Sequence, residues 1–169
     1  MAIVVEDGSV VTGANSYASI AEVRAYATER GVTLDADDAV VEVQMHKAMD
    51  WLEGYEDRFT GERYTADQEL SWPRLYAEVH GFDVAYNAIP SQLIKAQAQL
   101  VVDVHNGVEL QPTVTDTRVV TEEKVDVITV KYAEGTATAG ATPGQPELVK
   151  AEMMLRPLLR SRGLYTVRV

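Results

Sequence analysis

The chain has 169 residues, no cysteine and a formal net charge of −11. This length suits one compact domain with appendages, and a chain without cysteine has neither a disulfide framework nor a thiol nucleophile. The negative charge argues against a broad phosphate-binding surface, because proteins bind nucleic acids mainly through lysine and arginine. No apolar run approaches the roughly 18 residues that span a bilayer, and the first residues lack the basic region of a secretion signal. We therefore expect a soluble protein made in a cytoplasm, without membrane contact.

The charge is distributed unevenly along the chain. Residues 150–169 contain five basic residues and one acidic residue, so the other 149 residues carry a net charge of −15. A basic end on an acidic protein is typical of a docking segment for an acidic partner. The last turn of a helix also favours cations, and the sequence leaves both interpretations open.

Two helices are predicted in the first third of the chain. Ser19 and Glu22 have the spacing of a capping box, which predicts a helix over residues 19–30. Asp35 is a suitable N-cap for a second helix over residues 36–53. The second helix has one apolar stripe, formed by Val41, Met45, Ala48 and Leu52.

The stretch QELSWPRLY, residues 68–76, places one of the two tryptophans directly before a proline. A residue before proline is shifted away from the helical region of backbone conformations, so we expect Trp72 to be presented from extended backbone. Trp72, Pro73 and Arg74 are predicted to form a structural anchor, with Trp72 filling a gap between helices and Arg74 reaching a neighbouring acidic surface. The second interpretation is that Trp72 contacts a partner.

A third helix is predicted between Pro90, at its first turn, and Gly107, after its end. Its wide apolar face should form the centre of the core. After Pro112 the apolar period changes to two, which predicts a β-hairpin over about 117–133, with strands near 117–123 and 127–133. Such a hairpin is marginal alone in water and needs a partner, either the helical body or a hairpin of another subunit.

The last part of the chain combines a linker, a helix and an extended end. Residues 134–146 have the small, polar composition of a linker. A last helix is expected to begin at Pro146 and to end or kink at Pro157. The final RSRGLYTVRV alternates apolar and basic residues and has no obvious place in a monomer's core. The predicted fold is therefore a single domain and mainly α: a small helical bundle over about 19–106, an inserted β-hairpin, and a C-terminal helix with an extended tail over 147–169.

Sequence motifs for catalysis or metal binding are missing. His46, His80 and His105 lie far apart without close ligand spacing. No dinucleotide, phosphate-loop or nucleophile-elbow motif is present. We therefore expect no enzyme, no catalytic residue, no metal and no cofactor.

Aromatic residues are frequent between residues 55 and 86, where acidic residues outnumber basic ones. Single-strand binders stack bases on aromatic side chains along a basic groove. An acidic aromatic region is a poor platform for a polyanion, so these aromatics are expected to pack a loop-rich segment onto the helices.

Several motifs, in a fixed order, resemble a known family of phage proteins. They are IVVEDG near the start, the Trp-Leu pair at 51–52, LSWPR at 70–74, Ile-Pro at 89–90 followed by Lys-Ala, and LRPLLR at 155–160. This order resembles a tailed-phage family often labelled DnaT-like single-stranded-DNA-binding protein, and it is also similar to the head–tail connector, or adaptor, proteins. The resemblance covers most of the chain, and its most specific part is Q-x-L-x-W-P-R combined with I-P-x-x-x-x-K-A.

The resemblance to connectors implies a structural virion protein at the neck, the head–tail interface, which is present in the host cytoplasm during assembly. It implies a homo-oligomeric ring, a dodecamer, between the portal protein and the tail or neck completion protein. Double-stranded DNA would pass through the ring without specific binding, because an acidic lumen repels phosphates. The alternative is a single-stranded-DNA-binding replication accessory protein that uses the basic tail and Tyr165.

Two groups of residues follow from the connector resemblance as sites of protein contact. The hairpin would contact a neighbouring subunit or the next ring through Val119, Thr121, Val127, Thr129, Val130 and Tyr132. The C-terminal tail would dock onto the portal protein through Arg160, Arg162, Leu164, Tyr165 and Val167.

Overall fold

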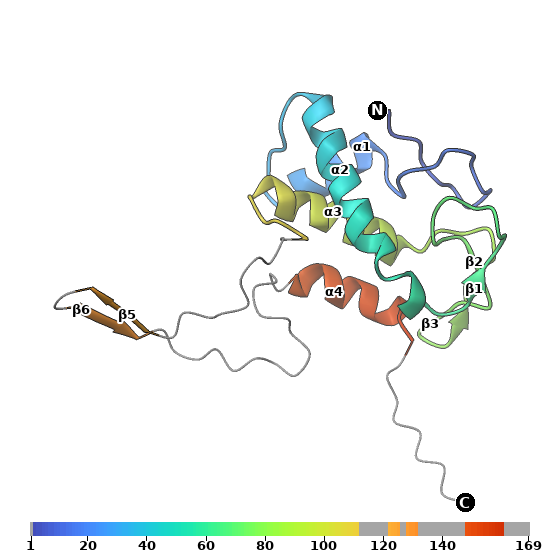
Figure 1. Cartoon of the computed structure of the whole chain (residues 1–169). Helices are drawn as coiled ribbons and strands as arrows, with labels where there is room; N and C mark the ends of the chain where they lie inside the picture. Colours follow the sequence, from blue (N-terminus) through green and yellow to red (C-terminus); the bar gives the residue numbers. More distant parts are fainter. Residues whose placement is uncertain (1, 112–121, 126–127, 132–147, 161–169) are drawn as a thin grey trace, which may run out of the picture.

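The computed structural model describes residues 2–111, 122–125, 128–131 and 148–160. These residues form four α-helices, two short 3₁₀ helices and three antiparallel pairs of strands (Figure 1). The helices pack together into one body, and the strands are short. The structure therefore confirms the predicted fold class, which is mainly helical with a β-hairpin between the third and fourth helices.

Helix α1 spans Ile20–Thr28, and the predicted capping box forms at its start. The Ser19 side chain accepts a hydrogen bond from the Glu22 backbone N–H, and the Glu22 carboxylate accepts one from the Ser19 N–H. The two residues together satisfy donors that have no partner within the helix.

Helix α2 spans Asp38–Glu53 and begins two residues later than predicted. Its N-cap is Asp37, whose carboxylate accepts from the Ala39 N–H, so the assignment of Asp35 as the cap is wrong. Asp35 instead accepts from the Asp37 N–H and shapes the turn before the helix. Both aspartates are suitable N-cap residues for α2, and sequence spacing alone does not decide which of them caps the helix.

Helix α3 spans Ser91–His105 and is the centre of the core. It contacts α1, α2 and the fourth helix, as its wide apolar face predicts (Figure 1). Pro90 is its N-cap rather than its first residue. The buried residues of α3 are Leu93, Ala96, Gln97, Ala98, Gln99, Leu100, Val101 and Val102.

Helix α4 spans Val149–Leu155 and packs against α3. The 3₁₀ helix η2, Arg156–Leu158, follows directly, so Pro157 ends the α-helix as predicted. Phe59 and Leu159 then form an antiparallel bridge between η2 and the segment after α2. The predicted start of this helix at Pro146 lies outside the described residues.

The segment between α2 and α3 contains two strand pairs that the sequence did not predict. The 3₁₀ helix η1, Glu56–Arg58, comes first. The first pair is β1, Glu62–Arg63, with β2, Arg74–Leu75. The second is β3, Glu78–Val79, with β4, Phe82–Asp83. Two-residue strands are too short for an alternating pattern to be recognised in a sequence.

The predicted hairpin forms, with shorter strands than expected. Strand β5, Glu122–Val125, pairs antiparallel with β6, Ile128–Lys131. The connection lies between Val125 and Ile128, and the hairpin lies apart from the four helices in Figure 1. Thr129 and Val130 of the predicted contact group lie on β6, whereas Val119, Thr121, Val127, Tyr132 and the linker 134–146 lie outside the described residues.

Candidate interaction surfaces

The tryptophan of the QELSWPRLY stretch is buried and held by polar contacts. Trp72 has no exposed surface, and its ring meets the Phe59 ring edge-on at a centroid distance of 6.0 Å. Its backbone N–H donates to the Tyr17 hydroxyl oxygen at 3.1 Å, and the Tyr17 hydroxyl donates to the Glu53 carboxylate at 2.7 Å. Glu53 also accepts from the N–H and the hydroxyl of Ser71. The chain start, α2 and this loop therefore share one buried polar network.

Tyr17 connects the same network to the central helix. Its N–H donates to the side-chain carbonyl of Gln97 at 3.0 Å, and the Gln97 amide donates to the Ser16 hydroxyl at 2.7 Å. Burial, reinforced by the nearby Glu53 carboxylate, raises the pKa of the Tyr17 hydroxyl well above its ordinary value. The hydroxyl therefore stays protonated and remains a hydrogen-bond donor.

Arg74 is buried within its own chain and does not reach a neighbouring acidic surface, so that expectation is wrong. Its guanidinium donates to the carbonyl oxygens of Thr60 at 2.8 Å, Gly61 at 3.0 Å and Ser71 at 3.1 Å. Burial lowers the pKa of this guanidinium. The Leu75–Ala77 backbone also approaches Gly61 closely, and a Cβ at position 61 would lie 2.2 Å from the Leu75 carbonyl oxygen. The arginine joins the two sides of the β1–β2 loop.

The first residue of the predicted docking tail is also bound to its own chain. The Arg160 guanidinium donates to the carbonyl oxygens of Phe59 at 2.9 Å and Gly61 at 3.1 Å. Its backbone N–H donates to the Arg58 carbonyl oxygen at 2.7 Å. The other four tail residues, Arg162, Leu164, Tyr165 and Val167, lie outside the described residues, so docking of the tail on a portal protein stays a prediction.

Four aromatic side chains between β1 and α3 are exposed, and we refer to them as the aromatic surface. Tyr76 is 81% exposed and Phe82 is 76% exposed. Tyr86 stacks on Tyr64 with a centroid distance of 5.2 Å, and both remain accessible. The prediction that the aromatics of this region pack onto the helices therefore holds for Phe59 and Trp72 and is wrong for these four.

Acidic side chains surround the aromatic surface along the chain. Those that are exposed and lie on the same segment are Glu62, Asp67, Glu69, Glu78 and Asp83. The two arginines of this segment are engaged elsewhere: Arg63 pairs with Glu56, and Arg74 is buried. The aromatic surface thus combines apolar area with negative charge.

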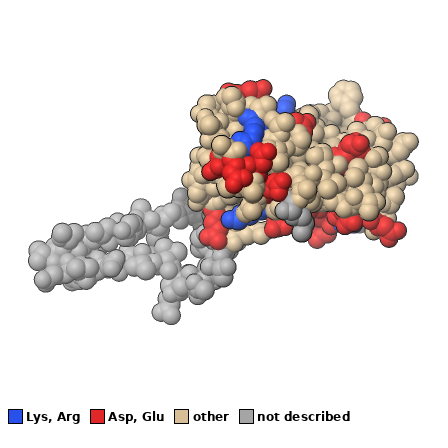
Figure 2. All heavy atoms as spheres, turned by 90° about the horizontal axis from the view of Figure 1, so that it is seen from above, with Lys and Arg blue, Asp and Glu red and all other residues tan. Residues whose placement is uncertain are grey.

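Several cations of the helical body are also engaged within the chain. Arg24 pairs with Asp38 at 2.7 Å, and the Arg30 guanidinium lies 3.4 Å from the centre of the Tyr26 ring. Arg58 lies over the ring of Tyr55. Figure 2 shows acidic atoms in several clusters on one face of the body, with basic atoms in a few small separate areas between them. This face offers little positive potential to a polyanion.

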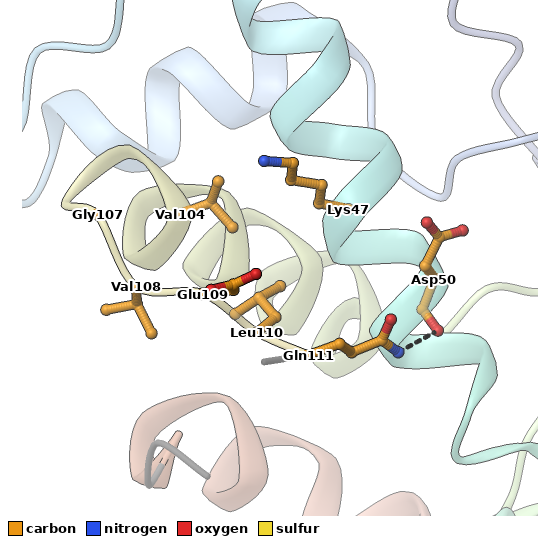
Figure 3. Close-up of a pocket in the computed structure, with 8 residues that line it drawn as sticks. All are labelled: Lys47, Asp50, Val104, Gly107, Val108, Glu109, Leu110 and Gln111. Carbon is orange, nitrogen blue, oxygen red and sulfur yellow. Dashed lines mark hydrogen bonds between the residues drawn. The ribbon is translucent and has the colours of Figure 1, made fainter. Parts of the chain in front are cut away.

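A hollow of about 350 Å³ lies where the chain leaves α3 (Figure 3). Lys47 and Asp50 of α2 form one side, and the segment from Gly107 to Gln111 forms the other. The Gln111 amide donates to the Asp50 backbone carbonyl oxygen at 3.3 Å, which ties that segment to α2. The described residues that line the hollow include no nucleophile paired with a base.

Two smaller apolar areas are exposed on helices. Val43 near the start of α2 is 55% exposed and Val40 is 39% exposed. On α4, Met153 is 66% exposed and Val149 is 51% exposed, four residues apart and thus on one face. The beginning of α2 and the β3–β4 pair lie at opposite ends of the body in Figure 1. The described surface therefore presents apolar area on more than one side.

Within the described ranges, no group of histidine, aspartate or glutamate side chains could hold a metal ion. The helices there are also too short or too polar for any of them to cross a membrane.

Comparison with known proteins gives one match. The model of a family described as "Putative DnaT-like ssDNA binding protein" matches residues 1–169. No curated protein and no solved structure matches the chain. Because the family match extends over its whole length, the chain belongs to the DnaT-like ssDNA binding protein family.

Proposed function

We propose that the protein is a structural head–tail connector of a tailed phage, which forms a ring between the portal protein and the tail or neck completion protein. The observation that carries this proposal is an acidic body in which Arg24, Arg63 and Arg74 are engaged within the chain while apolar side chains remain exposed at opposite ends. Such a surface favours protein partners over nucleic acid.

The charge supports a ring that surrounds DNA without gripping it. The chain carries −11 overall, and Arg24, Arg63 and Arg74 are taken up by partners within the body. Phosphate binding requires cations that can replace counterions. A lumen lined by the acidic face would repel the phosphates of passing double-stranded DNA and leave it free to slide.

The position of the apolar areas supports contacts of the head-to-tail type. A closed ring needs two different faces on each subunit, one of which meets the other on the next copy. Two such faces are available on the body. One contains Val40 and Val43 on α2, the other is the aromatic surface near β3–β4, and they lie toward opposite ends of the body. The β5–β6 hairpin, which lies apart from the helices in Figure 1, is the second element offered to a neighbour or to the next ring.

The copy number in purified virions tests the connector function. Particles of a phage that encodes the chain are purified, and the protein is quantified by mass spectrometry against the portal protein. We expect as many copies as the portal has, which agrees with a dodecameric ring on a twelve-fold portal. Absence from virions, with the protein abundant in infected cells, would refute the function.

Binding of the portal protein tests the predicted docking tail. Truncation after Arg160 removes Arg162, Leu164, Tyr165 and Val167 and keeps the Arg160 contacts with Phe59 and Gly61. Truncation after Leu159 removes those contacts as well. We expect both truncated chains to fold and to fail in portal binding. Portal binding by the chain truncated after Arg160 would contradict tail docking.

Single-stranded DNA binding is the second candidate function, and the family description favours it. It would rest on the basic residues 160–169 with Tyr165. Fluorescence anisotropy with a labelled single-stranded oligonucleotide tests it at two salt concentrations. Strong binding that falls with salt and is lost on truncation after Arg160 would establish this candidate. We expect weak binding that the truncation does not change.

A further inference from the structure

The aromatic surface, formed by Tyr64, Tyr76, Phe82 and Tyr86, is an apolar area for which the described residues provide no cover. Tyr76 and Phe82 are the most exposed of the large apolar side chains, at 81% and 76%. Tyr64 and Tyr86 stack on each other, Tyr76 and Phe82 belong to the same short segment of the chain, and exposed apolar area on a soluble protein can mark a contact site.

The charge around the surface selects a basic occupant. Glu78 and Asp83 are cross-strand neighbours on β3 and β4, one position along the strands from Val79 and Phe82, and both side chains are exposed. The arginines on the same segment are buried or already paired. A segment that alternates cations with apolar residues matches this arrangement, because charges of opposite sign meet while the apolar side chains cover the rings.

The C-terminal segment, residues 161–169, has that chemistry and begins beside the surface. It reads SRGLYTVRV and contains Arg162 and Arg168 together with leucine, tyrosine and valines. The preceding Arg160 is fixed by hydrogen bonds to Phe59 and Gly61. Gly61 lies against Ala77, the neighbour of Tyr76, so the segment leaves the body next to the aromatic surface.

Length and tethering make docking within one chain the favoured arrangement. Nine extended residues reach about 30 Å, which exceeds the spacing between neighbouring loops of one domain. A short tether gives an effective concentration in the millimolar range, so a weak contact is occupied within the chain. We propose that in the free subunit, before any ring forms, residues 161–169 dock onto the aromatic surface of the same chain, with the two arginines near Glu78 and Asp83.

A spin label on the full-length chain tests this proposal. The chain has no cysteine, so Val169→Cys provides a single attachment site for a nitroxide. We expect the label to broaden the amide NMR signals of residues 76–83 selectively. A nitroxide at Ala36→Cys, in the loop between α1 and α2, is the matched control and should leave these signals sharp.

Mixing distinguishes the chain's own segment from that of a second copy. ¹⁵N-labelled protein without nitroxide is mixed with unlabelled protein that carries it, and we expect no broadening of residues 76–83. Broadening in the mixture would assign the surface to the tail of a second copy and overturn docking within the chain. Absence of broadening in both samples would overturn docking altogether.

Charge reversal tests the role of the acidic residues. Glu78→Lys with Asp83→Lys should abolish the broadening, whereas Asp50→Lys with Glu109→Lys makes the same change in charge at the hollow beside α3 and should preserve it. All four side chains are exposed, so both variants are expected to fold. Persistent broadening in the first variant would overturn the electrostatic part of the proposal. These measurements use the free protein and do not depend on the proposed function.

Discussion

Two neighbouring parts of the loop between α2 and α3 use aromatic residues in opposite ways. Around Trp72 and Arg74 the side chains are buried; the Trp72 backbone N–H donates to Tyr17, and the Arg74 guanidinium donates to the carbonyl oxygens of Thr60 and Gly61. A few residues later, Tyr76 and Phe82 face outward. The comparison indicates that the number of aromatic residues does not decide whether a part of this loop is buried. What decides it is whether α2 and the start of the chain provide hydrogen-bond partners for that part.

The difference has a physical basis in the backbone. Each buried backbone donor or acceptor in the first part needs a partner, because an unpaired one costs about 1–3 kcal/mol. Glu53 and Arg74 supply such partners to the loop. In the second part, β3 and β4 pair only with each other over two residues each; Val79 packs against the core, and Glu78, Phe82 and Asp83 stay at the surface.

The largest effect is expected from Trp72→Ala. The substitution removes a fully buried indole that packs on Phe59. We expect a loss of about 3–5 kcal/mol in the free energy of unfolding, measured by urea denaturation. A loss of about 0.5 kcal/mol or less, which is typical of a surface substitution, would show that the loop does not depend on this side chain.

Arg74→Lys should have the second-largest effect, a loss of about 3 kcal/mol in the free energy of unfolding. One ammonium group cannot reach the three carbonyl oxygens that the guanidinium fork serves, so at least one buried acceptor loses its donor. Urea denaturation measures the loss, and Arg24→Lys, at a surface pair with Asp38, is the control. Equal stability of the two variants would contradict the role of Arg74.

Tyr17→Phe should cost about 2 kcal/mol, because the buried Trp72 N–H loses its acceptor and Glu53 loses a donor. Thermal unfolding measures this loss. Tyr55→Phe is the matched control, since the Tyr55 hydroxyl contacts Glu152 at the surface. If the control is as destabilising as Tyr17→Phe, the buried network is not what holds the loop.

The raised pKa of Tyr17 predicts a loss of stability at alkaline pH. Above the ordinary tyrosine pKa of 10.0, the unfolded chain releases the hydroxyl proton while folded Tyr17 retains it, because burial raises its pKa. The unfolded state then binds fewer protons, so the free energy of unfolding falls as pH rises above about 10. Tyr17→Phe should flatten this fall. Tyr55→Phe should flatten it less, although burial raises the pKa of Tyr55 to about 12, because Tyr55 is partly exposed.

The smallest effect on stability is expected from substitution of the exposed rings of Tyr76 and Phe82. Tyr76→Asn with Phe82→Ser removes two exposed rings, and asparagine tolerates the positive φ of 54° at position 76. We expect the free energy of unfolding to change by about 0.5 kcal/mol or less. A large destabilisation would mean that these rings belong to the core and not to a contact surface.

The sequence by itself determined the elements whose signals are local. The capping box at Ser19, the stop at Pro157 and the wide apolar face of α3 depend on neighbours within a turn or two of helix, so spacing predicts them. The hairpin was predicted for the same reason, although its paired strands are shorter than the alternating pattern. The choice of Asp37 over Asp35 was missed because both residues satisfy the local rule.

Only the tertiary structure decided what the loop residues do. Arg74 binds the carbonyl oxygens of Thr60 and Gly61 on the other side of its loop, Arg160 binds residues about a hundred positions earlier, and Tyr76 is left at the surface. These outcomes depend on which carbonyls and carboxylates the packed helices bring within hydrogen-bond distance. Sequence spacing carries no information on contacts across such separations, so the buried network and the exposed aromatic surface emerged only once the helices were in place.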